Sequence, residues 1–247
     1  MEDLSIRILS EIVSSIKNDA EIRGTAFGLR FNLVKSRHTG IASTLGEPFL
    51  GKIKEKSAKE LAKLSFSDNV SHASVGVAAI NSLIDVDEER CIEINASKII
   101  EKLAENKNIS VIGHFPFVDE LKKVAKNVWV FEKRLKEGDL PFEAKDEFLK
   151  TSDVVAISGT TLINRTFPSI IRSCRKDAIT ILLGPSTPLS EVIFDYGANN
   201  LEGVIIENEK EAELLVNRGC TFREMKAKGI VSLLTIAKEK KLVSGGG

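Results

Sequence analysis

The sequence lacks a net charge and a long apolar run, and each absence excludes a class of protein. Lys plus Arg and Asp plus Glu number 35 each in 247 residues, and no basic stripe is interleaved with aromatic residues. A nucleic-acid partner is therefore not expected. The first 20 residues mix charged with apolar residues, and no later run approaches the length of a membrane span. These patterns predict a cytoplasmic protein without membrane insertion.

Cysteine and histidine are also scarce. Cys91, Cys174 and Cys220 are far apart and form no C-x-x-C spacing, which favours reduced, buried or half-buried thiols over a disulfide or zinc framework. The three histidines are isolated from one another, and none forms a His-x-x-x-His pair.

The amino-terminal part, residues 1–92, has the pattern of a small α+β domain. Helical periodicity begins at Leu4 and continues to near Asn18, and alternation of apolar and polar residues then predicts an antiparallel hairpin. Its strands are Phe27–Leu33 and Thr39–Leu45. A helix rich in Ala and Val, His72–Ile84, should be buried on most sides and capped by Ser71.

Asn81 lies inside this apolar helix. A buried amide must find hydrogen-bond partners. It is either a structural cross-link to a neighbouring loop or a ligand contact, and the sequence leaves both readings open.

Residues 93–247 alternate apolar strands with amphipathic helices, which predicts a Rossmann-like, doubly wound parallel sheet. The predicted strands are Ile109–Gly113, Val128–Phe131, Asp153–Ser158, Ile179–Gly184 and Gly203–Ile206. The predicted helices are Val118–Lys126, Ala144–Thr151, Ile163–Cys174, Leu189–Tyr196 and Lys210–Arg218. The tail from Phe222 to Leu242 is apolar, but its pattern does not distinguish helix from strand.

Unusual turns follow three of these strands and should converge on one crevice, because parallel strands end at the same edge of a sheet. The first contains Gly113, His114, Phe115 and Pro116. The second carries the polar side chains of Ser158, Thr160, Thr161, Asn164 and Thr166, and the third contains Gly184, Pro185, Ser186 and Thr187. Hydroxyls at a helix start suit an anion, although Ser and Thr are also ordinary N-caps.

Glu132 follows Gly113 by about 20 residues, the spacing at which dinucleotide-binding domains place an acid for the ribose hydroxyls. The first turn lacks G-x-G-x-x-G, however, and Phe115 and Pro116 would block a pyrophosphate. We therefore expect no NAD, whereas a nucleoside without pyrophosphate, such as S-adenosylmethionine, stays open.

His114 is the histidine placed at a strand end, where a neutral imidazole can ligate a metal or move a proton. A structural hydrogen bond is the alternative. Asp139, in Glu-Gly-Asp-Leu-Pro, is a second candidate oxygen ligand or an ordinary turn residue.

Several of these segments together resemble the putative heavy-metal chelation family. The segments are Ala78-Ala-Ile-Asn81, Val111-Ile-Gly-His-Phe-Pro-Phe117, Glu137-Gly-Asp-Leu-Pro141, Ser158-Gly-Thr-Thr-Leu-Ile-Asn164, Gly184-Pro-Ser-Thr-Pro-Leu-Ser190 and Phe194-Asp-Tyr-Gly197. The resemblance implies an amino-terminal domain like that of enolase, a Rossmann-like carboxyl-terminal domain and a site in the cleft between them.

Two functions then compete. One is a protein of metal homeostasis that binds a divalent metal ion or a metal-chelating small molecule, with His114 as the metal ligand. The other is an enzyme acting on a small anionic or nucleoside-containing substrate. The strand-end turns lack thiolates, which favours a bound metal complex over a bare ion. A purely structural role and the oligomeric state stay open.

Overall fold

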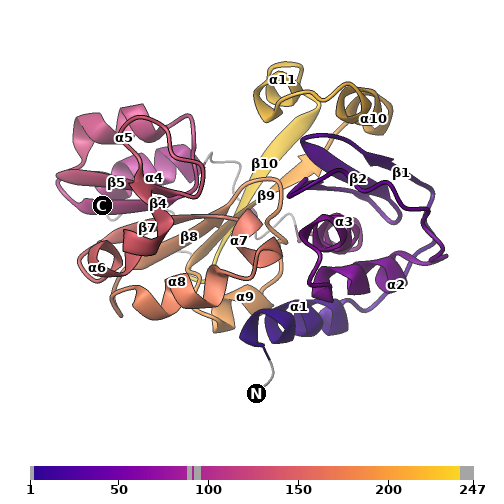
Figure 1. Ribbon diagram of the computed structural model, residues 1–247, viewed down its shortest axis with the longest axis horizontal. Helices are drawn as coiled ribbons and strands as arrows, with labels where there is room; N and C mark the ends of the chain where they lie inside the picture. Colours follow the sequence, from indigo (N-terminus) through magenta and orange to yellow (C-terminus); the bar gives the residue numbers. More distant parts are fainter. Residues whose placement is uncertain (1–2, 88–90, 92–95, 240–247) are drawn as a thin grey trace.

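The computed structural model describes residues 3–87, 91 and 96–239, which form two separate sheets (Figure 1). The first is antiparallel, in the order β1-β2-β3, and the second has the order β10-β9-β8-β7-β4-β5-β6. The small sheet comprises β1 Gly24–Phe27, β2 Phe31–Lys35 and β3 Thr39–Ser43. The large sheet comprises β4 Asn108–Ile112, β5 Asn127–Glu132, β6 Leu140–Pro141, β7 Val154–Ser158, β8 Ile179–Leu183, β9 Asn200–Ile206 and β10 Val231–Ala237.

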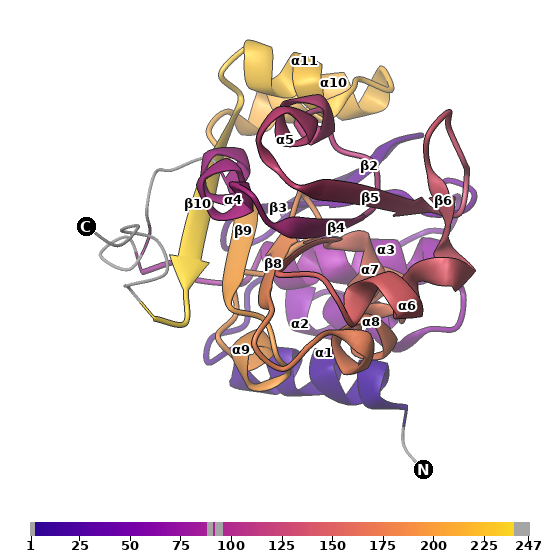
Figure 2. The same cartoon turned by 90° about the vertical axis from the view of Figure 1, so that its left-hand side faces the viewer.

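Helices cover both faces of the large sheet (Figure 2). The helices of the described chain are α1 Leu4–Ser15, α2 Ala58–Ala62, α3 Val70–Asn81, α4 Ala96–Ala104, α5 Val118–Val124, α6 Lys145–Leu149, α7 Thr160–Ile163, α8 Phe167–Ser173, α9 Val192–Asp195, α10 Glu209–Asn217 and α11 Phe222–Ala227, with 3-10 turns η1 Lys63–Phe66 and η3 Phe142–Ala144. One face packs on α4 and α5, and the other on α6, α8 and α9. The predicted doubly wound α/β fold with a small α+β part before it is confirmed.

The strand order reverses between β4 and β7. From β4 the chain proceeds outward to β5 and β6, then returns to place β7 on the other side of β4. Such a reversal leaves a crevice outside the carboxyl ends of the two strands. The turns after Ile112 and Ser158 therefore border the position where this fold class binds ligands.

Two predicted elements were wrong in the amino-terminal part. The strand predicted for Phe27–Leu33 is broken by a turn, and β1 and β2 pair with each other on either side of it. The turn brings Gly28 against α10, where a Cβ atom would lie 2.3 Å from the carbonyl oxygen of Val216, and Leu29 is 74% exposed. The cap of α3 is Asn69 instead of Ser71.

The helix predicted for Ile163–Cys174 was also wrong, because α7 and α8 are separate. Arg165 between them has a φ of +61°, and its guanidinium bonds Asp68 and the carbonyl oxygen of Phe66. The tail, which the sequence left open, folds as α11 followed by β10, which runs antiparallel to β9. No helix in the described part of the chain combines the length and hydropathy that a membrane span requires.

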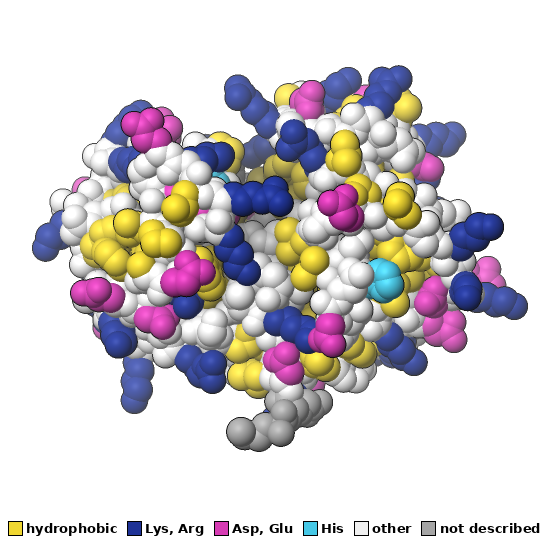
Figure 3. Space-filling view, viewed as in Figure 1, with side chains coloured by type: hydrophobic (Ala, Val, Ile, Leu, Met, Phe, Trp, Pro, Cys, Tyr) yellow, Lys and Arg dark blue, Asp and Glu magenta, His cyan; other side chains and the backbone are white. Residues whose placement is uncertain are grey.

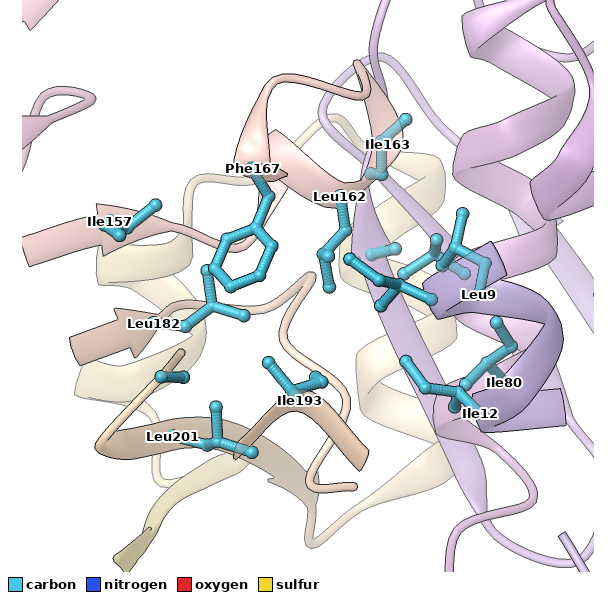
Figure 4. Packing of buried hydrophobic residues seen from close by; sticks show 14 of the residues in the cluster. Leu9, Ile12, Ile80, Ile157, Leu162, Ile163, Phe167, Leu182, Ile193 and Leu201 are labelled. Atoms are coloured by element: carbon cyan, nitrogen blue, oxygen red, sulfur yellow. The ribbon is translucent and has the colours of Figure 1, made fainter. Parts of the chain in front are cut away.

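One hydrophobic core joins the two parts of the chain. Leu9 and Ile12 of α1 and Ile80 of α3 belong to the same buried cluster as Leu162, Phe167 and Ile193 of the α/β part (Figure 4). All six side chains are at most 2% exposed. Burying an aliphatic side chain contributes about 1.5–3 kcal/mol, so this shared core fixes the relative position of the two parts.

The amino-terminal part also makes polar contacts with the turn after β8. The Ser43 N–H donates to Ser186 Oγ at 2.8 Å, and Asn81 Nδ2 donates to the carbonyl oxygen of Pro185 at 3.2 Å. Phe115 and Phe117, in the turn after β4, take no part in these polar contacts. Those two rings stack 5.1 Å apart and pack against the cluster under α4 and α5.

Glu202 is a buried acid within the sheet. It lies on β9 between Leu183 and Thr235, is 4% exposed, and accepts the N–H of Ala96 at the start of α4. Burial raises the pKa of Glu202 to about 7, against the smaller opposing effects of the Ala96 N–H and the Lys226 charge.

Glu202 should make the stability of the protein pH-dependent. Because its folded pKa lies above the ordinary value of 4.5, its contribution is fully present below that value and is lost as the pH rises through about 7. The free energy of unfolding in urea should therefore fall by up to about 3 kcal/mol between about pH 5 and about pH 8 in the wild type. The Glu202→Gln variant should not show this fall. The exposed-residue control Glu207→Gln should behave like the wild type, and parallel curves for the wild type and Glu202→Gln would contradict this account.

Two glycines of the strand-end turns have nearly equal backbone conformations but different surroundings. Gly113 has a φ of +107°, and a Cβ there would lie 3.0 Å from Ser158 Cβ; Gly184 has a φ of +108° with nothing within 4 Å. Both alanine variants should lose about 1–2 kcal/mol of stability from backbone strain. Gly113→Ala should lose more in chemical denaturation because it also pushes Ser158 away. Equal losses would show that the β4 and β7 turns are not packed as described.

Candidate functional site

His114 and Asp139 meet at the carboxyl edge of the sheet. His114 follows β4, and Asp139 precedes the two-residue strand β6, which pairs with β5. His114 Nδ1 lies 3.6 Å from Asp139 Oδ1, and the side chains are 38% and 4% exposed. Asp139 Oδ2 accepts the Lys136 N–H at 2.9 Å, which fixes the carboxylate. The buried acid thus lies beside a half-exposed imidazole, at a distance longer than a hydrogen bond, and His114 Nε2 has no hydrogen-bond partner among the described residues.

Ser158 and Thr160 form a hydroxyl pair beside this turn. Ser158 Oγ lies 2.8 Å from Thr160 Oγ1 and accepts the Thr160 N–H at 3.3 Å. Gly113 is adjacent, since a Cβ there would meet Ser158. Because α7 has only four residues, its dipole adds little at this position. The β7 turn could therefore bind a polar ligand through its hydroxyl groups, and the dipole of α7 would contribute little.

The surface is hollowed between the lobe carrying α4 and α5 and the lobe carrying α10 and α11, and Lys and Arg side chains lie beside the hollow (Figure 3). The loop after β5 supplies exposed cations at the same edge of the sheet, namely Lys133, Arg134 and Lys136. Lys133 lies over the Phe142 ring. Among the described residues, no acid pairs with Arg134 or Lys136.

Several predicted site residues bond within their own turns. Thr161 Oγ1 donates to the Ser158 carbonyl at 2.7 Å, and Asn164 Oδ1 accepts the N–H and hydroxyl of Thr166. Glu132 Oε2 accepts the N–H groups of Lys133 and Arg134 at 3.0 and 3.3 Å. These bonds are the ordinary structural roles of such side chains.

The turn after β8 faces the amino-terminal part. Pro185 and Ser186 bond to Asn81 and Ser43, whereas Thr187 Oγ1 is buried without a hydrogen-bond partner in the part of the chain that the structure describes. Gly184 borders open space. The structure thus divides the predicted residues into three groups. The first lies at the β4–β7 edge and contains Gly113, His114, Asp139 and Thr160, with Phe115 half-buried and Pro116 exposed beside them. The second forms bonds within its own turns and contains Thr161, Asn164, Thr166 and Glu132, and the third lies toward the amino-terminal part and contains Asn81 and Gly184–Thr187.

Apart from Asn81, the sequence did not identify the residues that the amino-terminal part brings to this edge. Ser43 bonds Ser186, and Arg37, His38 and Thr39 line a cavity of about 490 Å³ together with Asn81 and Thr187. They lie at the ends of β2 and β3. These residues belong to no sequence motif. The one feature that could have identified them is that they are polar residues at strand ends.

The donor set does not suit a bare metal ion. Among residues 3–87, 91 and 96–239, no group of three or more His, Cys, Asp or Glu side chains is placed to hold one. Burial raises the pKa of Cys174 to about 12 and also raises that of Cys220. Thiolates, the ligands that soft metals prefer, are therefore not supplied by these two residues.

Known proteins from three organisms resemble this chain over most of its length. A crystal structure of a protein of unknown function from Desulfitobacterium hafniense DCB-2 superposes with a TM-score of 0.82 at 23% identity, covering 94% of this chain and 98% of that one. One from Pyrococcus horikoshii gives 0.81 at 24%, covering 95% and 99%. An uncharacterized protein of Methanocaldococcus jannaschii is 27% identical over 231 residues, 85% of this chain and 88% of that protein.

Two sequence profiles described as putative heavy-metal chelation match residues 10–84 and 95–235. Together they span both sheets and the strand-end turns. The chain belongs to the putative heavy-metal chelation family.

Proposed function

We propose that the protein binds a metal ion presented as a complex by a small anionic chelator, at the β4–β7 edge of the sheet. The observation that carries this proposal is the pairing of half-exposed His114 with buried Asp139. A metal-ligating histidine commonly donates its other ring N–H to a carboxylate, which fixes the tautomer. With the proton on Nδ1, which lies 3.6 Å from Asp139 Oδ1, the lone pair of Nε2 is free to coordinate a metal.

A complex fits this site better than a bare ion because the chelator brings most of the ligands. The protein needs to fill only an open coordination position, and His114 Nε2 is suited to that role. The Ser158 and Thr160 hydroxyls and the cations of the loop Lys133–Lys136 then contact the anionic chelator.

The site would lie in a cleft between two domains, residues 1–92 and 93–247. The shared core and the contacts of Ser43 and Asn81 with the β8 turn support this arrangement. The likeness of the first domain to that of enolase remains a prediction, as does the cytoplasmic location.

A second candidate is an enzyme acting on a small anionic or nucleoside-containing substrate. The same His114–Asp139 pair supports it, since an imidazole beside a carboxylate can act as a general acid or base. Chemical conversion of an added substrate that is lost in His114→Ala would favour this function over binding alone.

The Ni²⁺–nitrilotriacetate complex is a suitable probe because it leaves coordination positions open for an imidazole. In calorimetric titration, the wild type should bind the complex more tightly than Ni²⁺ alone. His114→Ala should abolish this binding, and Asp139→Asn should weaken it by about 10–100-fold through loss of orientation.

His38→Ala and His72→Ala are the matched controls. His38 also contacts a carboxylate, with Nε2 2.8 Å from Asp85 Oδ1, but it lies in the β2–β3 turn and not at the β4–β7 edge. Both variants should keep the wild-type affinity. An unchanged affinity in His114→Ala, or equal binding of Ni²⁺ alone and of the complex, would refute the proposed site.

A further inference from the structure

A further cavity lies where the carboxyl end of α1 meets the loop after α3 and the connection from β8 to α9. We call it the α1 cavity; it has a volume of about 560 Å³ and is lined by residues 15–18, 83–87 and 189–191 and by Ile236. Cavities of roughly 300–1,000 Å³ are typical of small-molecule sites. His114, Asp139, Ser158 and Thr160 are not among the lining residues, so the α1 cavity is separate from the metal-complex site.

One part of the α1 cavity is an aliphatic wall. Its six side chains are Ile16, Leu83, Ile84, Val86, Leu189 and Ile236. No aromatic ring is among the described residues that line the cavity, so a flat ligand would find no ring to stack on. Removing apolar surface from water is favourable, and a branched aliphatic group would cover this wall.

Two hydrogen-bond donors of the cavity are unused. Ser190 is 8% exposed, and its hydroxyl has no hydrogen-bond partner in the part of the chain that the structure describes. This hydroxyl is not one of the wholly buried unpaired groups, such as those of Ser65 and Thr187, so it keeps surface that a ligand can reach. The ammonium group of Lys17, just after α1, is exposed and pairs with no acid among the described residues. Two donors, one of them charged, suit a carboxylate.

The opposite charge in the cavity is supplied by Asp85. Arg37 Nε donates to Asp85 Oδ1 at 2.6 Å, and His38 Nε2 lies 2.8 Å from the same oxygen. Asp85 Oδ2 accepts no hydrogen bond from the described residues, and the side chain is 57% exposed. A carboxylate has room for several donors, so Oδ2 can accept an ammonium group. Asp87 and Glu191 also line the cavity, where carboxylates therefore outnumber ammonium groups.

The α1 cavity thus offers unused groups of both signs beside an aliphatic wall. A simple anion would meet three carboxylates there, and a simple alkylammonium ion would meet Lys17. A zwitterion can place each of its charges beside the opposite one. We propose that the α1 cavity binds a free aliphatic amino acid, with its carboxylate on Lys17 and Ser190, its ammonium group on Asp85 and its side chain on the wall. This site stands independently of the metal-complex proposal.

Amino acids and their blocked derivatives test both charged contacts. The probes are L-leucine, L-isoleucine and L-valine, titrated at millimolar concentration into the full chain in a calorimeter. At least one should bind the wild type. The N-acetyl derivative of that amino acid lacks the ammonium group and its amide lacks the carboxylate, so each derivative should bind at least about tenfold more weakly.

Two variants remove the proposed donors. Lys17→Met and Ser190→Ala should each weaken amino-acid binding about tenfold. The matched controls are Lys52→Met, at an exposed lysine that does not line the cavity, and Ser65→Ala, which removes an unpaired hydroxyl elsewhere. Both controls should bind like the wild type. All four variants should keep the wild-type melting temperature, because none of them removes a side-chain hydrogen bond or ion pair from the described chain.

The proposal is overturned if none of the three amino acids binds, or if the blocked derivatives bind as tightly as the amino acid. Equal affinities of Lys17→Met and Lys52→Met, or of Ser190→Ala and Ser65→Ala, would also overturn it. His114→Ala should leave amino-acid affinity unchanged; a loss there would place the amino acid in the metal-complex site and overturn the proposal.

Discussion

The hydrophobic core shared by α1, α3 and the helices α7 to α9 is the constraint on which the rest of the structure depends. Leu9 and Ile80 are fully buried against side chains such as Leu162 and Ile193 of the α/β part. Packed interiors do not deform continuously, so this contact holds the amino-terminal sheet at a fixed place above the carboxyl edge of the large sheet. The contacts of Ser43 and Asn81 with the β8 turn follow from that placement.

This docking covers one strand-end turn and leaves another accessible. The β8 turn is covered by the amino-terminal part, and the Ser186 hydroxyl oxygen accepts a hydrogen bond from the Ser43 N–H. The β4 turn is left open, so His114 stays half-exposed while Asp139 behind it is almost wholly buried. In the proposed site, the buried carboxylate lies beside the accessible imidazole and leaves Nε2 for the ligand.

The sequence predicted the parallel strands and their turns because buried parallel strands are continuous apolar runs that end at small residues. It placed His114 and Thr160 at one edge for the same reason. It did not predict the pairing of His114 with Asp139, which depends on a strand of only two residues. The break at Gly28 depends on the approach of α10 from nearly 200 residues later, and the break at Arg165 depends on bonds to Asp68 and Phe66. Such tertiary contacts override local periodicity.

In the site proposed above, His114 presents one ring nitrogen to a metal complex. Electron paramagnetic resonance tests this directly. The sample is the Cu²⁺–nitrilotriacetate complex mixed with protein whose histidines are labelled with ¹⁵N. We expect the copper to couple to a single ¹⁵N-imidazole in the wild type, and we expect this coupling to be absent in His114→Ala. A spectrum with no imidazole coupling, or one that is unchanged by the substitution, would contradict the claim.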